Sequence, residues 1–409
     1  MSTLTLLIGP GEVSAGDRLV LFPCVVGFFF VFRVCLNFLF FQSDLVMGAI
    51  VSITIDFALL YGTVLYSTDV RAHGRSQLLQ IPLIRWLLAY LALSVTSVLW
   101  TGAQSAIAAL AFWAGMSADV LIVVLLLRRG DAKDNTEGIL QGAVWGAVGV
   151  SLIAWSSPAT ADLRLGNDTF LHPNSLGLEI GVATLIAQYL ASRGTLWKWL
   201  SIALSITLLR TLSKTAIVAF VVAECWYLMQ NTQMTRKTKM RLGAAALLVI
   251  ASFWDLLHSY IDVYNNTGSG NQAETLTGRT LVWTVAFSMS LDKPWLGHGI
   301  YSFKTLVPAF GTFQAVHAHN ELLQQFFEYG LAGVVIVAGV YWSFYRQALR
   351  APASELRTLA LTVLLFALVR GLADTIIFGL SYPLWLLTAL SLYLAQPTTQ
   401  VQPTLTLRK

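Results

Sequence analysis

Twelve apolar segments, most of them about as long as a membrane-crossing helix, constrain this chain more than any other feature of its sequence. A bilayer core of about 30 Å offers no partner to a free backbone amide, so it is crossed by roughly 20 apolar residues in helical form. Charged residues make up only 11% of the 409 residues, against about 25% in soluble domains, so a soluble fold could not hide this much apolar surface. The segments are 19–41, 45–66, 81–100, 105–127, 138–157, 174–191, 195–211, 213–230, 242–260, 330–346, 356–378 and 382–396. We expect an all-α integral membrane protein of about 12 transmembrane helices, with residues 1–409 forming one polytopic domain.

The placement of lysine and arginine between these segments predicts which side of the membrane each connection faces. With a cytoplasmic N-terminus, 17 of the 26 basic residues fall on the inner side, six on the outer side and three within spans. Basic residues concentrate on the cytoplasmic side of membrane proteins. The first 18 residues also lack the pattern of a cleaved signal peptide. We therefore expect both termini in the cytoplasm.

The longest connection, residues 261–329, then lies on the outer face. It opens with the polar stretch 265–271, which has the composition of a flexible loop. A helix is predicted from near Thr277 to a point before Pro294, and a second from about His319, with Gly330 ending it or bending it into the next span. Long loops with elements of their own are usually functional. We expect a helical loop that caps the bundle and forms part of the catalytic region.

Two histidines at the predicted start of the second helix are the strongest candidates for chemistry. His317 and His319, followed by Asn320, can be read as metal ligands, as a general base or as polar loop residues. No carboxylate or cysteine stands at a standard metal-ligand spacing, so we expect no metal here. A helix N-terminus disfavours the imidazolium form, which favours a neutral histidine that can accept a proton. The cysteines show no paired or metal-ligand spacing either; they are Cys24, Cys35 and Cys225.

Several cations lie on or near the outer side, against the general charge bias. They are Arg210, Lys214 and Arg279 in outer connections, and Arg33 and Arg370 in the outer halves of spans. Charge within a membrane is costly and usually marks a function, and guanidinium and ammonium groups neutralise phosphates without metal. We expect a bound phosphate or diphosphate. The non-functional alternatives are that Arg210 and Lys214 simply extend to the membrane interface, and that Asp374, four residues after Arg370, neutralises that arginine.

Carboxylates within the predicted spans favour a competing interpretation. Chains of buried acidic groups are typical of proton-coupled transporters. The acidic residues in question are scattered over five spans, with no visible pairing apart from Arg370 with Asp374. They are Asp56, Asp119, Glu179, Glu224 and Asp374. A transporter therefore stays open as a function of another class.

The histidine motif and four further motifs resemble the superfamily of O-antigen ligases and polymerases, which are polytopic glycosyltransferases. The most specific part is His319-Asn320 followed, after nine residues, by Gly330 and then Gly333. The other matching stretches are 172–177 (HPNSLG), 213–216 (SKTA), 277–279 (TGR) and 297–303 (GHGIYSF). Their order agrees as well, and the resemblance covers roughly residues 158–345.

The resemblance implies an enzyme of the bacterial inner membrane with its active site on the periplasmic face. The donor would be a glycan on undecaprenyl diphosphate, transferred en bloc and with inversion to the lipid A-core oligosaccharide, without nucleotide, metal or other cofactor. A polymerase of the same superfamily, whose acceptor is another undecaprenyl-linked unit, is the nearest alternative. Apart from these two substrates and membrane lipids, no partner is expected, and no nucleic acid.

By the resemblance, His319 is the catalytic histidine and Arg279 is the loop cation on the diphosphate. Lys214 stands where many relatives have arginine, which keeps the charge but loses the two-pronged contact. From the charge argument, Lys214, Arg210, Arg279 and Arg33 are expected to bind the diphosphate. The expected supporting residues are Asn320, His317, His172, Asn174 and Arg370.

Overall fold

The computed structural model describes 11 stretches of the chain: residues 15–41, 45–67, 78–128, 132–158, 160, 163–166, 171–230, 235–252, 276–310, 314–375 and 384–396. Within them, every regular element is a helix, and helices overlap all twelve apolar segments predicted from the sequence. Six helices are long and apolar enough to cross a membrane, and two shorter apolar helices accompany them. The prediction of an all-α, multi-pass membrane protein is confirmed; the count of twelve spans stays a prediction.

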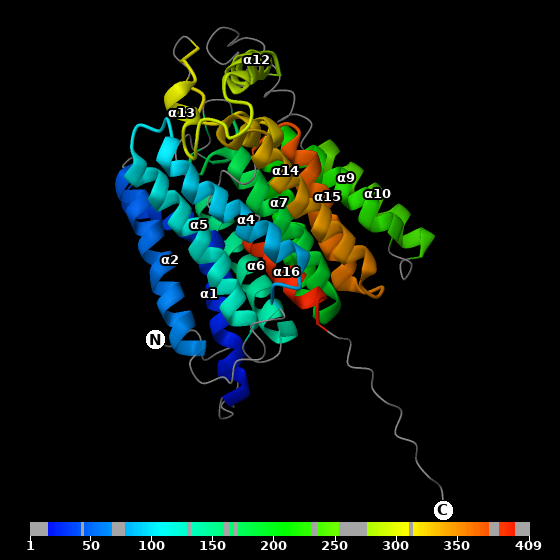
Figure 1. The fold of residues 1–409 in the computed structure, drawn as a ribbon. Coiled ribbons are helices and arrows are strands. Elements are labelled where there is room, and N and C mark those ends of the chain that lie inside the picture. The colour runs from blue at the N-terminus through cyan, green and yellow to red at the C-terminus, as the bar shows by residue number, and fades with distance from the viewer. Residues whose placement is uncertain are drawn as a thin grey trace, which may run out of the picture.

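The helices run side by side as one bundle, with α12 and α13 together at the end of the bundle opposite the turn between α14 and α15 (Figure 1). The elements are α1 (Ala15–Phe41), α2 (Leu45–Ser67), α4 (Pro82–Thr96), α5 (Ala106–Leu127), α6 (Ala132–Ser156), α7 (Pro173–Leu190), α8 (Thr195–Arg210), α9 (Lys214–Gln230), α10 (Arg236–Ser252), α12 (Leu276–Asp292), α13 (Phe303–Leu306), α14 (Glu321–Arg350), α15 (Glu355–Gly371) and α16 (Leu384–Leu394).

Small residues bring the bundle helices close together. A β-carbon at Gly142 on α6 would overlap the Cys24 carbonyl of α1, and one at Gly27 on α1 would overlap the Ile139 carbonyl of α6. In lipid, association of helices depends on such close packing, because lipid tails are as apolar as the side chains. The sequence therefore builds an intimate contact between α1 and α6 without relying on the hydrophobic effect.

A buried ion cluster joins α1, α2 and α5. The Arg33 guanidinium donates to Asp119 over 2.9 and 2.7 Å, and it also donates to Asp56. The sequence analysis found no pairing for these two aspartates, and that conclusion was wrong because the partners lie on separate spans, far apart along the chain. Each carboxylate is thus compensated within the bundle, as buried charges must be.

The helices predicted within the long connection are confirmed where the structure describes them. α12 covers Leu276–Asp292, against a prediction from near Thr277 to a point before Pro294. The polar stretch 265–271 lies outside the described residues. α12, α13 and the first turns of α14 share a hydrophobic core of their own, separate from that of the bundle. Its fully buried members are Val282, Ala286, Phe303, Val307, Ala315, Ala318 and Phe327.

α14 is bent at Gly330 rather than ended there, which is one of the two predicted alternatives. Gly330 has φ +62°, a conformation that glycine adopts at no steric cost. Residues 294–299 form backbone hydrogen bonds to α14 on both sides of the bend. The His298 N–H donates to the Phe327 carbonyl over 2.9 Å, and the Leu331 N–H donates to the Pro294 carbonyl over 2.8 Å. These bonds satisfy backbone groups that the bend releases.

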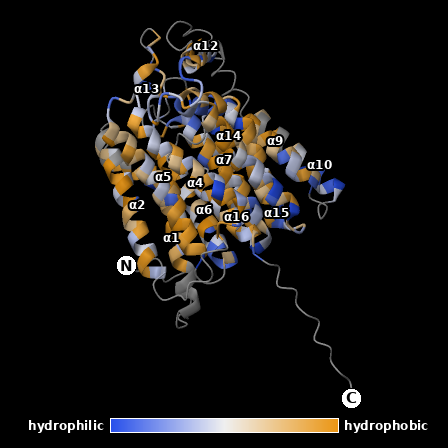
Figure 2. Ribbon diagram, viewed as in Figure 1, coloured by the Kyte–Doolittle hydropathy of each residue, from blue (hydrophilic) through white to orange (hydrophobic). Residues whose placement is uncertain are grey.

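Several helix boundaries differ from the prediction: α6 begins at Ala132 rather than 138, α15 ends at Gly371 rather than 378, and α10 also differs. The span expected at 242–260 begins earlier, since α10 runs from Arg236 to Ser252 and includes basic residues expected in a connection. Figure 2 shows this end of α10 in the hydrophilic colour, whereas most of the bundle is hydrophobic. Lysine and arginine have high helix propensity and reach water from a helix end, so the helix continues past the apolar stretch. Residues 253–260 lie outside the described residues.

Candidate functional site

The site lies at the N-terminal end of α14, around its N-cap residue. Asn320 is the N-cap: its Oδ1 accepts the Leu323 N–H over 3.0 Å. Such a cap satisfies a backbone donor that the first turn leaves free. The other end of the same amide, Nδ2, donates to the Leu372 carbonyl just beyond α15 over 2.9 Å. A single side chain therefore starts α14 and ties that start to the end of α15.

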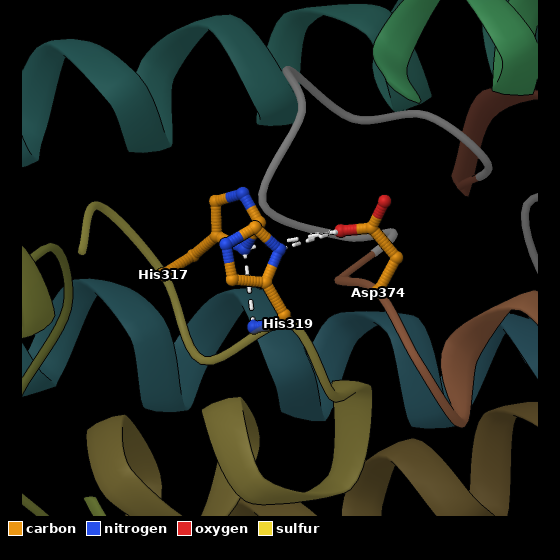
Figure 3. A group of neighbouring side chains, drawn as sticks. All are labelled: His317, His319 and Asp374. Carbon is orange, nitrogen blue, oxygen red and sulfur yellow. Dashed lines mark hydrogen bonds and ion pairs between the residues drawn. The ribbon is translucent and has the colours of Figure 1, made fainter. Parts of the chain in front are cut away.

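The two histidines precede this cap and face the same carboxylate. Nδ1 of His319 lies 3.4 Å from Oδ1 of Asp374, and Nδ1 of His317 lies 3.9 Å from it (Figure 3). The imidazole centroids are 4.1 Å apart, and the His319 N–H donates to Nδ1 of His317 over 3.2 Å. His319 has φ +51°, an uncommon value for a residue with a side chain. The contacts to Asp374 are ion-pair distances rather than well-formed hydrogen bonds.

Asp374 lies beyond the end of α15 and is almost fully buried. NH2 of Arg370 donates to its Oδ2 over 2.8 Å, and the Thr375 N–H donates to its Oδ1 over 2.9 Å. Burial alone would raise the pKa of Asp374, but the Arg370 guanidinium and the two histidines hold that pKa well below its ordinary value. The predicted neutralisation of Arg370 by Asp374 is confirmed, and the carboxylate is ionised beside the histidines.

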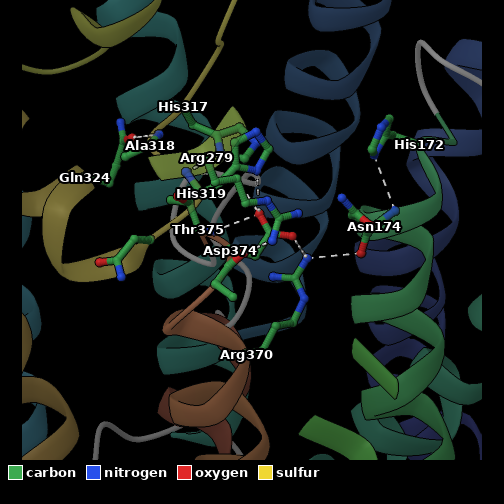
Figure 4. A network of polar contacts seen from close by, with 12 residues as sticks. His172, Asn174, Arg279, His317, Ala318, His319, Gln324, Arg370, Asp374 and Thr375 are labelled. Atoms are coloured by element: carbon green, nitrogen blue, oxygen red, sulfur yellow. Dashed lines mark hydrogen bonds and ion pairs between the residues drawn. The ribbon is translucent and has the colours of Figure 1, made fainter. Parts of the chain in front are cut away.

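Arg279, on α12, reaches the turn after α15 that contains Asp374. Its NH1 donates to the Ala373 carbonyl over 2.7 Å, and the side chain is 8% exposed. Figure 4 shows the Arg279 guanidinium beside the two histidines and Asp374. The structure thus brings Arg279, the predicted loop cation, close to His319, the predicted catalytic histidine, although 40 positions separate them in the sequence.

A polar layer from α7 lies behind this group. NH2 of Arg370 donates to the Asn174 carbonyl over 3.0 Å, and Nδ1 of His172 accepts the Asn174 N–H over 3.3 Å (Figure 4). Oδ1 of Asn174 accepts from Arg164 NH2 over 2.6 Å and from the Ser213 hydroxyl over 3.1 Å. The motifs at 172–177 and 213–216, recognised separately in the sequence, are therefore in direct contact.

The remaining predicted cations have different surroundings. Lys214, exposed at the start of α9, directly follows Ser213 of this layer. NH1 of Arg210 donates to the Leu163 carbonyl over 2.6 Å. Arg33 instead forms its ion pairs with Asp119 and Asp56 in the bundle. We correct the expectation for Arg33, because a guanidinium already engaged by two buried carboxylates is a poor partner for a diphosphate.

Sequence reasoning missed two members of the site. Asp374 was considered only as a counter-charge for Arg370 and as a scattered carboxylate. Arg164 was counted only among the six basic residues on the outer side. The i, i+4 spacing of Arg370 and Asp374 was a visible signal for their pairing, but no pattern indicated that Asp374 meets the histidines. Arg164 gave no signal beyond its charge.

The cluster also has the donor atoms of a possible metal site. One ligand atom from each of His317, His319 and Asp374 can be chosen so that all lie within 4.8 Å of one another. No carboxylate stands at a standard metal-ligand spacing in the sequence, but Asp374 reaches the histidines from a distant part of the chain. Against a metal, Asp374 already carries the Arg370 guanidinium, whose positive charge would repel a cation.

Fold and site together define a multi-pass membrane protein with a histidine–carboxylate pair and an arginine gathered at one end of its helices. Residues 199–338 match the Wzy_C family, described as O-antigen ligase. The resemblance found in the sequence is confirmed over these residues. Members of this family are O-antigen ligases and polymerases, enzymes of glycan transfer. No curated protein matches the chain.

Proposed function

We propose that this protein is an O-antigen ligase of the bacterial inner membrane. It would transfer a glycan en bloc from undecaprenyl diphosphate to the lipid A-core oligosaccharide, on the periplasmic face. The observation that carries the proposal is the line of contacts from Arg370 through Asp374 to His319, with Arg279 bound to the same turn. The family match and the apolar helices, which suit a lipid-linked donor, support it.

His319 is the general base in this proposal. A sugar hydroxyl is a weak nucleophile, and a neutral imidazole within hydrogen-bond reach takes its proton during attack. Asp374, kept ionised by Arg370, directs Nδ1–H of His319 toward itself and leaves Nε2 to accept the proton. It also stabilises the imidazolium that forms, as a carboxylate does in other base–orienter pairs.

The bond changes follow from this assignment. The acceptor O–H bond breaks as its proton moves to His319, and the oxygen forms a new bond to the anomeric carbon of the donor. The bond between that carbon and the diphosphate oxygen breaks, and its electron pair leaves with the diphosphate. Attack from the opposite face inverts the anomeric configuration. Arg279, with Lys214 and Arg210, stabilises the charge that develops on the leaving group.

The two alternatives differ from this proposal in what they require. A polymerase of the same family uses the same residues but takes a second undecaprenyl-linked unit as acceptor. A proton-coupled transporter requires carboxylates along a path, whereas Asp56 and Asp119 are both bound to Arg33. We therefore favour glycan transfer, and the acceptor is the variable to test.

The test is transfer by the purified protein in detergent or vesicles, with undecaprenyl-diphosphate-linked glycan as donor. Lipid A-core and a second undecaprenyl-linked unit are offered separately. We expect glycan on lipid A-core, and product on the undecaprenyl-linked unit instead identifies a polymerase. His319→Ala should lose about 10² to 10⁴ in rate while donor binding survives, the usual range for a lost general base.

His317→Ala, made in the same loop and tested at the same protein level, is the matched comparison. It should lose less than His319→Ala, because His317 lies farther from Asp374. Near-normal transfer by His319→Ala would remove the proposed base and the mechanism with it.

A further inference from the structure

Ala318, the residue between the two histidines, is held by side chains at both of its backbone polar groups. The Ala318 N–H donates to Oε1 of Gln324 over 2.7 Å (Figure 4). The Ala318 carbonyl accepts from Nε1 of Trp283 on α12 over 2.8 Å. The two hydrogen bonds come from different helices, and they fix the two successive peptide groups on either side of the Ala318 α-carbon.

The methyl group of Ala318 is fixed as well. Ala318 is fully buried in the hydrophobic core that α12, α13 and the start of α14 share. Gln324 is 1% exposed and lies on the first turns of α14, where its own N–H donates to the Asn320 carbonyl over 2.9 Å. The loop residue beside His319 is therefore anchored in three directions.

These contacts matter for the backbone conformation of the next residue, His319. His319 has φ +51°, a backbone conformation that costs free energy in a residue with a side chain. Without restraint the backbone would relax toward negative φ and would turn the imidazole away from Asp374. The position of the His319 imidazole therefore depends on contacts that keep the backbone in this strained conformation.

We propose that Gln324 and Trp283 are positioning residues for His319: by holding the backbone N–H and C=O of Ala318, they keep the imidazole against Asp374 and directed at the acceptor. This inference rests on the proposed function, since it assumes that His319 is the base. Gln324 and Trp283 act through the backbone of Ala318 and do not touch substrate.

The primary variants each remove one hydrogen bond and leave a large side chain in place. Gln324→Met removes the acceptor of the Ala318 N–H, and Trp283→Phe removes the donor to its carbonyl while keeping an aromatic ring. Each should lower kcat about tenfold to a hundredfold, in the range expected for misplacing a catalytic group by about 1 Å, with KM for the donor unchanged. The matched control is Gln325→Met: Gln325 is also buried on α14, but its Nε2 donates to Oε1 of Glu321 over 3.0 Å, away from the loop.

The pH–rate profile separates positioning from a purely structural role. If the imidazole moves away from the Asp374 carboxylate, its protonated form loses a stabilising charge. The acid limb of kcat/KM should therefore move to lower pH in Gln324→Met and Trp283→Phe, and stay in place in Gln325→Met. An unmoved limb in both primary variants would overturn the inference.

A double-variant cycle gives the decisive outcome. In a His319→Ala background, Gln324→Met should cost nothing further, because the residue it positions is gone. A full additional loss in that background would mean that Gln324 acts on folding or on another group, and would refute the inference while leaving His319 as the base. Near-normal transfer by His319→Ala alone would instead refute the proposed function, so the two failures are distinguishable.

Discussion

Asp374 organises the site at the scale of single residues. Its two oxygens meet a guanidinium on one side and two imidazoles on the other, and all of these groups are largely removed from water. In such surroundings charges interact more strongly than at an exposed surface. The orientation of His319 and the charge state of the cluster therefore depend on one carboxylate.

Replacement of Arg279 tests binding and catalysis together. Arg279→Ala should weaken donor binding and lower turnover by about 10² to 10³, because a diphosphate is charged in the ground state and gains charge as it leaves. Arg279→Lys should restore only part of the activity, since a point charge cannot make a two-pronged contact. Donor binding and initial rates are measured side by side. Arg193→Ala, which removes a cation paired with Glu137, is the control, and an equal effect there would contradict a specific role.

Acidification should destabilise the cluster through His317. Burial, and then the neighbouring His319, Arg370 and His172, lower the pKa of His317 well below its ordinary 6.5, although Asp374 opposes them. Below about pH 6.5, His317 therefore binds a proton in the unfolded chain but stays neutral in the folded chain. The free energy of unfolding that is present above this pH is lost as the pH falls.

The measurement is thermal unfolding at about pH 7.5 and about pH 5.5. One pH unit below 6.5, the loss reaches about 1.4 kcal/mol for a single group. His317→Gln should reduce the fall in unfolding temperature between the two pH values. An unchanged fall in the variant would show that other groups cause it.

Chelation should leave transfer intact. In the proposed function, the outer cations supply the charge neutralisation that a divalent ion supplies in other glycosyltransferases, and Arg370 already occupies the carboxylate of the only His–Asp cluster found in the described residues. Activity is compared before and after treatment with EDTA, with magnesium, manganese and zinc added back separately. Loss with EDTA and recovery with one ion would assign His317, His319 and Asp374 as ligands.

At this scale the sequence predicted the chemistry but not the contacts. His319, Asn320 and Arg279 were recognisable because they stand in motifs of fixed spacing. Asp374 was not, because its approach to His319 is set by the packing of α15 against α14, and no local pattern encodes that packing.

Helix α14 links the site to the bundle at the scale of elements. It begins at the Asn320 cap, carries buried polar residues in its first turns and bends at Gly330 before continuing to Arg350. The bend was predictable, since an isolated glycine at that position favours one. The second chain segment that lies against the bend was not, because nothing in the sequence indicates that residues 294–299 pair with α14.

Gly330→Ala should therefore be costly. The new β-carbon would combine strain at positive φ with overlap onto the backbone of Trp295 and Leu296. We expect a loss of roughly 1–3 kcal/mol and a fall in folded yield, measured by thermal unfolding in detergent. Gly243→Ala on α10 is the matched control, because a β-carbon there meets nothing within 4 Å and alanine favours a helix. Equal stability of the two variants would contradict this account.

The whole molecule is a bundle with its site at one end, and the unequal distribution of basic residues predicts how it sits in the membrane. The apolar segments alone were enough to predict the helices, because a bilayer leaves few other solutions. Their packing order, the α1–α6 contact and the Arg33 cluster required the structure, since they join residues of distant segments.

Orientation is testable by labelling. In a background without native cysteines, single cysteines in residues 231–241 or 346–356 should resist a membrane-impermeant thiol reagent in intact cells. A cysteine near Ser269, which lies outside the described residues, should react. Permeabilised cells provide the control for access. Labelling of the basic segments from outside would reverse the orientation and place the histidines in the cytoplasm.

The paired bend at Gly330 limits how this protein can move. Four backbone hydrogen bonds join the segment 294–299 to α14, two before the bend and two after it. At about 1 kcal/mol net for each, a hinge at this glycine would have to break bonds worth roughly 4 kcal/mol, so the bend is a rigid elbow. The amides of His298, Gly299, Leu331 and Ala332 should therefore exchange with deuterium as slowly as the bundle core. In the proposed function, the bulky glycan then enters beside a stationary cap rather than beneath one that lifts.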